Sequence, residues 1–83
     1  MEARVPRYFF HVHDGHSEID LEGLDAASVE AARLMAVQLA AETLREGAHR
    51  RMFGDAWYLE VFDETGGMVC SVDVRVTVPV AGG

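Results

Sequence analysis

The sequence predicts an α+β fold, in which a single four-stranded antiparallel sheet carries one helix packed on one of its faces. Four segments have the composition or alternation of β-strands, one segment has helical periodicity, and their order along the chain is β-β-α-β-β. The chain has 83 residues, which is short for a domain. We therefore expect a single domain over residues 1–83, with an ordered core at about residues 6–78.

The first two strands are predicted before residue 22. Residues 7–13 are rich in aromatic and β-branched side chains, and the Asp14-Gly15 dipeptide that follows them favours a hairpin turn. Residues 17–21 are then expected to return as a short antiparallel strand. In the first strand, alternation places the following side chains on one face: Tyr8, Phe10 and Val12.

A single amphipathic helix of about 18 to 22 residues is predicted after residue 24. Either Asp25 or Ser28 can cap its first turn, and Gly47 suits a left-handed C-terminal cap. Leu34 and Met35 flank the apolar stripe, so they leave apolar surface uncovered in a monomer. The stripe itself recurs at steps of three and four residues: Val29, Ala32, Ala36, Leu39, Ala40 and Leu44.

The last two strands are predicted to form a second hairpin. Residues 57–62 form the third strand, residues 63–67 a turn, and the chain then alternates strictly from Met68 until Pro79 removes a ladder donor. The first and fourth strands are the most apolar, which favours placing them at the centre of the sheet, side by side. Other strand orders would produce the same sequence pattern.

The charge and composition of the chain exclude several classes of protein. The net charge of -7, with arginine as the only basic residue apart from histidine, repels nucleic acid. No apolar run approaches the roughly 20 residues of a membrane span, and the N-terminus lacks the apolar core of a signal peptide. Cys70 has no second cysteine to pair with, which fits a reducing compartment. These observations predict a cytoplasmic protein that binds neither nucleic acid nor membrane.

A cluster of histidines is the one pattern that suggests a metal site. His11, His13 and His16, together with Asp14, offer the imidazole and carboxylate ligands that zinc accepts. Short histidine clusters are weakly specific, however, so we interpret them as exposed strand and turn residues and expect no cofactor. A metal-binding protein or a small metal-dependent enzyme is the alternative.

Other potentially reactive side chains have structural interpretations. Asp20, Glu22 and Asp25 lead toward the positive end of the predicted helix. Cys70 falls on the apolar face of the fourth strand, where a buried thiol is inert. Catalytic acid–base pairs need a cleft that so small a two-layer domain hardly provides. We therefore expect no enzymatic activity and no catalytic residue.

Three segments resemble a family of short, mainly alphaproteobacterial proteins known as a domain of unknown function. They are the opening Pro-Arg-Tyr-Phe-Phe-His-Val-His-Asp-Gly at residues 6–15, Glu22-Gly23 leading into residues 30–33, and Glu-Val-Phe-Asp-Glu-Thr-Gly at residues 60–66. The similarity extends from Pro6 to about Val76. It implies a bacterial cytoplasmic protein and supplies no activity, ligand or catalytic residue.

The remaining expectation is a non-catalytic protein-interaction module that self-associates, in the form of a homodimer. A chain this short buries a smaller fraction of its surface than a larger domain does, so a partner that covers more would stabilise it. An unpaired valine-rich strand offers an edge for such a partner. We expect the interface on the helix or on the fourth strand, at Leu34, Met35, Val74, Val76 and Val78.

Overall fold

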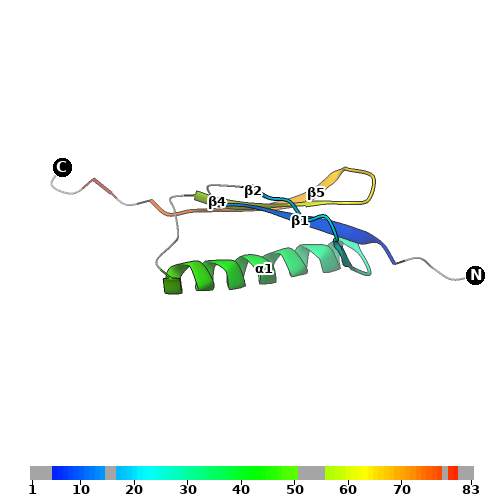
Figure 1. Cartoon of the computed structure of the whole chain (residues 1–83), viewed down its shortest axis with the longest axis horizontal. Coiled ribbons are helices and arrows are strands. Elements are labelled where there is room, and N and C mark those ends of the chain that lie inside the picture. Colours follow the sequence, from blue (N-terminus) through cyan, green and yellow to red (C-terminus); the bar gives the residue numbers. More distant parts are fainter. Residues whose placement is uncertain (1–4, 15–16, 51–55, 78, 81–83) are drawn as a thin grey trace, which may run out of the picture.

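The computed structural model describes residues 5–14, 17–50, 56–77 and 79–80. Its helix lies across one face of an antiparallel sheet and leaves the opposite face uncovered (Figure 1). The predicted α+β class is confirmed, with five strands where four were expected. The elements, in chain order, are β1 (Arg7–His13), β2 (Ser17–Glu18), β3 (Leu24–Asp25), α1 (Val29–Arg50), β4 (Ala56–Phe62) and β5 (Met68–Arg75).

The strand order differs from the favoured one. The sheet runs β2-β1-β4-β5, with β3 pairing the start of β1, so β4 is central and β5 lies at an edge. Central placement of β4 follows from its side chains, because Trp57, Leu59 and Val61 are the largest fully buried residues of the described chain. Each needs covering strands on both sides, whereas the core-facing residues of β5 are only half-buried. The apolar content of β5 therefore did not make it central.

The helix begins as predicted but ends later. Ser28 caps it, since its Oγ accepts the Ala31 N–H at 3.1 Å. Gly47 was expected to end the helix, yet α1 continues to Arg50 and Gly47 does not adopt a positive φ. A glycine inside a helix costs only about 1 kcal/mol, and no proline follows to stop the helix.

The core lies between the helix and one face of the sheet. Alanines of α1 let its backbone approach the strands closely, and the large side chains come from β1 and β4. Half-buried Leu39, which the sequence placed on the apolar stripe of the helix, packs against this core, and so does half-buried Val72 of β5. The buried residues are Tyr8, Phe10, Ala26, Ala32, Ala36, Ala40, Trp57, Leu59 and Val61.

The second predicted strand is shorter than expected. It was predicted over residues 17–21 but covers only Ser17–Glu18, and a separate strand follows at Leu24–Asp25. Asp20 separates the two, because its Oδ1 accepts the N–H groups of Glu22 and Gly23 at 3.1 and 3.0 Å and so stabilises a turn.

A register shift interrupts the predicted alternation of β5. Val61 lies opposite Cys70 and Phe62 opposite Met68, so Val69 is one residue in excess of the β4 strand. Met68 consequently shares the uncovered face with Phe62 and is exposed, whereas uninterrupted alternation would have placed it on the core face with Cys70. From Cys70 onward the predicted alternation holds, with Val72 and Val74 directed toward the helix side.

Candidate functional site

The histidines of β1 lie on the uncovered face of the sheet. His11 is opposite Glu60 and His13 is opposite Tyr58 in the β1–β4 pairing. The His13 ring stacks on Tyr58 with 4.3 Å between ring centroids, and the His11 ring lies tilted against Phe62 at 5.3 Å. Both side chains lie on the face opposite Tyr8 and Phe10, as the alternation predicted, but they are half-buried rather than exposed, because their rings pack against Tyr58 and Phe62.

Both histidines already bind groups of their own chain. His11 Nδ1 accepts the Asp20 N–H at 3.0 Å. His13 contacts Ser17 Oγ through Nδ1 at 2.7 Å and Glu60 Oε1 through Nε2 at 2.9 Å. A metal ion would have to displace these partners at every one of those three nitrogens.

The structure brings no metal-ligand set together in the part that it describes. Within residues 5–14, 17–50, 56–77 and 79–80, no three histidine, cysteine or acidic side chains converge as ligands. His16, the third candidate ligand, lies outside the described residues, and Asp14 is exposed at the end of β1.

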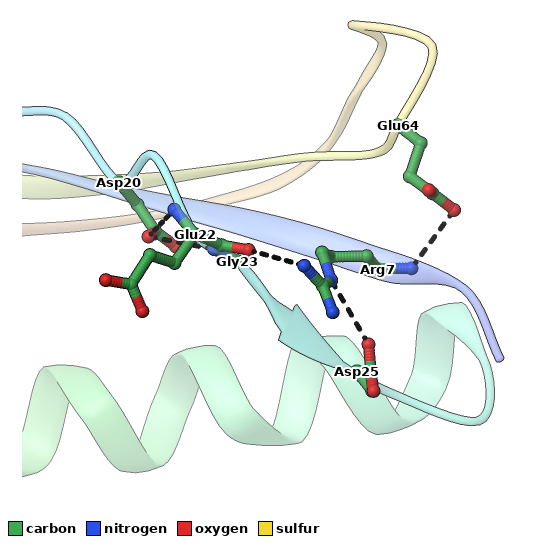
Figure 2. A network of polar contacts seen from close by, with 6 residues as sticks. All are labelled: Arg7, Asp20, Glu22, Gly23, Asp25 and Glu64. Carbon is green, nitrogen blue, oxygen red and sulfur yellow. Dashed lines mark hydrogen bonds and ion pairs between the residues drawn. The ribbon is translucent and has the colours of Figure 1, made fainter.

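A polar network fastens the segment between β2 and α1 to the sheet (Figure 2). Arg7 Nε donates to Asp25 Oδ1 at 3.3 Å, and its guanidinium also donates to the Glu22 carbonyl at 3.1 Å. The Arg7 backbone N–H donates to Glu64 Oε1 at 3.2 Å, from the turn between β4 and β5. The sequence had suggested Asp25 as a possible cap of the helix N-terminus. In the structure, Asp25 binds Arg7 instead.

Asp20 is the most highly bonded carboxylate of this segment. Its Oδ2 accepts the Phe10 N–H of β1 at 3.1 Å, in addition to the two turn amides on Oδ1. Partial burial raises the pKa of Asp20, but these amide bonds and the nearby His11 outweigh burial and hold the pKa below its ordinary value. The Asp20 carboxylate thus satisfies the Phe10 N–H, a backbone donor of β1, and has a structural function.

Apolar side chains border the histidines in an open groove of about 540 Å³. Ile19 and Leu21 are 55 % and 86 % exposed along it, and Phe9 and Phe62 belong to its floor. Sequence reasoning did not single out Ile19 or Leu21, because two exposed apolar residues in a short strand and turn carry no periodic signal.

A second apolar surface lies where α1 meets the edge of the sheet. Leu34 and Val37 are 66 % and 58 % exposed and line a groove of about 220 Å³ together with Cys70, Ser71 and Val72 of β5. We use the name β5 edge surface for Leu34, Val37 and the edge of β5 that faces away from β4. Val37 was not predicted, although its spacing of three residues from Leu34 places both on one helix face.

The five predicted interface residues divide between this surface and the core. Leu34 lies on the β5 edge surface, and Val76, which follows β5, is 49 % exposed. Met35 and Val74 are half-buried and pack against the core of their own chain, which leaves part of each side chain accessible. Val78 lies outside the described residues. Of the two helix candidates, Leu34 adjoins β5 at Cys70, Ser71 and Val72, in the strand that also carries Val74.

Cys70 sits in the same groove and has the character of a structural thiol. It is half-buried, and this burial raises its pKa although Arg33 opposes the effect. A raised pKa keeps the thiol protonated and poorly nucleophilic at neutral pH.

These observations define a small α+β domain whose described polar groups mainly serve its own strands and turns. The chain belongs to the family described as a domain of unknown function (DUF6894), whose model matches residues 7–75. Searches of curated proteins and of solved structures find no match. In the described part of the chain, no helix combines the length and apolar character needed to cross a membrane.

Proposed function

We propose that this protein is a non-catalytic interaction module that forms a homodimer through the β5 edge surface. The observation that carries the proposal is the placement of β5 at the edge of the sheet, next to two exposed apolar residues of α1. An edge strand presents backbone N–H and C=O groups that a further strand can pair with.

The two edges of the sheet differ in how they are protected. At the β1 edge, β2 pairs with residues 12 and 13, β3 pairs with residues 7 and 8, and the Asp20 carboxylate binds the Phe10 N–H between them. At the β5 edge, no described strand covers residues 68–75. Beyond the bulge at Val69, β5 has neither a proline nor a lysine to discourage pairing. This asymmetry favours β5 as the edge that binds a partner.

The helix adds apolar area to the open edge. Leu34 and Val37 lie beside β5, so a partner that extended the sheet would also cover them. Burial of an exposed leucine or valine side chain stabilises a complex by roughly 1.5 to 3 kcal/mol. A strand partner alone would lack this contribution.

The absence of catalysis and a cytoplasmic location are part of the same proposal. His11, His13 and Asp20 are bound within the fold, and the raised pKa of Cys70 disfavours a nucleophilic thiolate. The single cysteine and the charge of -7 agree with a reducing compartment and with a protein partner rather than nucleic acid.

Sedimentation equilibrium over a hundredfold concentration range tests the dimer. We expect a reversible monomer–dimer equilibrium that Leu34→Glu weakens, because the variant places a charge on the β5 edge surface. Leu21→Glu is the matched control, since Leu21 is exposed at the opposite edge of the sheet. A mass of one chain at every concentration would refute the proposal, and equal effects of both variants would remove the β5 edge surface from the interface.

A further inference from the structure

The sequence of β5 and its continuation is complementary to itself when two copies run antiparallel. In a symmetric antiparallel pair, the two-fold axis is perpendicular to the sheet, so one residue must lie opposite its own copy. Residues at equal distances on either side of that centre then face one another. The choice of central residue therefore fixes every cross-strand pair in the dimer.

Resting on the proposed dimer, we infer that the partner is a second copy of this chain bound with Val74 opposite Val74 of the other copy. With this centre, Asp73 of each chain faces Arg75 of the other, which gives two opposite-charge pairs. Val72 faces Val76 and Ser71 faces Thr77, so apolar pairs lie on the helix side and small hydroxyl residues on the other side.

Neighbouring registers lose this complementarity. A centre one residue earlier places Asp73 against Asp73, and a centre one residue later places Arg75 against Arg75, at the closest point of the interface. A centre at Ser71 or Val72 leaves Arg75 without a carboxylate opposite it. The register centred on Val74 is therefore the one that pairs both charges of β5.

In the monomer, both charged side chains are accessible to a partner strand, as this register requires. Asp73 and Arg75 are exposed, lie on the uncovered face with Tyr58, and form no ion pair with the described part of their own chain. Val72 and Val74 lie on the opposite face and pack against the core below the sheet. The same two-fold axis keeps both helices on that face, where Leu34 of each copy adjoins the shared edge.

Charge exchange at the two positions tests the register. Asp73→Arg places two arginines opposite each other at both pairs, and Arg75→Asp places two aspartates there. Each single variant should weaken the dimer roughly tenfold or more, from the loss of two attractive pairs and their replacement by repulsion. The double variant Asp73→Arg with Arg75→Asp restores both pairs and should regain most of the affinity. Glu42→Arg, on the part of the helix near β2, is the control for the change in net charge.

Mixing the two single variants gives the sharper result. An Asp73→Arg chain and an Arg75→Asp chain form a heterodimer with opposite charges at every pair, so the mixture should dimerise although each variant alone does not. Sedimentation velocity, with one variant carrying a fluorescent label, measures this association. Circular dichroism of each variant alone confirms the fold, which exposed substitutions should preserve.

The outcomes separate the inference from the proposed function. A wild-type chain that stays monomeric overturns both. A wild-type dimer whose affinity is unchanged by either single variant overturns the register and leaves dimerisation intact. Single variants that weaken the dimer without rescue in the double variant or in the mixture also overturn the register, because charge complementarity would then not explain the loss.

Discussion

The close approach of Gly23 to β1 gives the most sharply defined stability prediction. Gly23 has a φ of 76°, and a Cβ added there would lie 2.7 Å from Arg7 Cγ and 2.9 Å from the Tyr8 carbonyl oxygen. Arg7 is held by its bonds to Asp25 and to the Glu22 carbonyl, and the Tyr8 oxygen is strand backbone. Neither can move aside without breaking contacts of the β2–α1 segment.

Gly66 offers a matched control for Gly23. It also has a positive φ, at 89°, but a Cβ added there meets no atom within 4 Å. Gly66→Ala should therefore cost roughly 1 to 2 kcal/mol for the backbone conformation alone. Gly23→Ala carries that cost and an overpacking cost of roughly 1 to 3 kcal/mol, for a total of about 2 to 5 kcal/mol.

Urea denaturation measures the difference between the two variants. Trp57 is the single tryptophan and is 2 % exposed, so its fluorescence reports loss of the core. With a slope near 1 to 3 kcal/mol per molar urea, the midpoint of Gly23→Ala should lie about 1 M below that of Gly66→Ala. Equal midpoints would refute the reasoning, because they would show that the contact with Arg7 and Tyr8 adds nothing to the conformational cost.

Three further predictions concern the core, the Asp20 turn and the histidines. Leu59→Ala should lower the free energy of unfolding by about 3 to 5 kcal/mol, and half-buried Leu39→Ala by about 2 kcal/mol; unchanged urea midpoints would show that the core is wrongly assigned. The pKa of Asp20 is below its ordinary 3.8, so the stability it provides is present above about pH 4 and is lost as the pH falls through the folded-state pKa. Asp20→Asn should therefore cost roughly 1 kcal/mol at pH 7 and progressively less below pH 3.8, whereas a pH-independent difference in urea titrations would contradict this. Zinc should not raise the melting temperature, because three of the four ring nitrogens of His11 and His13 have partners within the chain; a micromolar affinity lost on His11→Ala or His13→Ala would favour the metal-binding alternative.

The sequence determined those features that depend on neighbouring residues. The alternation of β1 predicted which side of the strand carries Tyr8 and Phe10, and the three- and four-residue steps predicted the buried alanines of α1. The turn at residues 63–67 was also predicted, and Asp63 stabilises it by accepting three hydrogen bonds from Thr65 and Gly67. Such features are local, because strand and helix periods and turn conformations are set within a few residues.

Only the tertiary structure decided which segments lie side by side. β4 rather than β5 is the central strand because the large side chains of Trp57 and Leu59 are buried beneath the helix. The apolar content of a strand does not show how much side-chain volume it buries. The reach of Asp20 to the Phe10 N–H shortened β2, and the bulge at Val69 turned Met68 to the uncovered face. The position of Leu34 beside β5 likewise came from packing, because periodicity defines the faces of each element but not the neighbour that each face or edge meets.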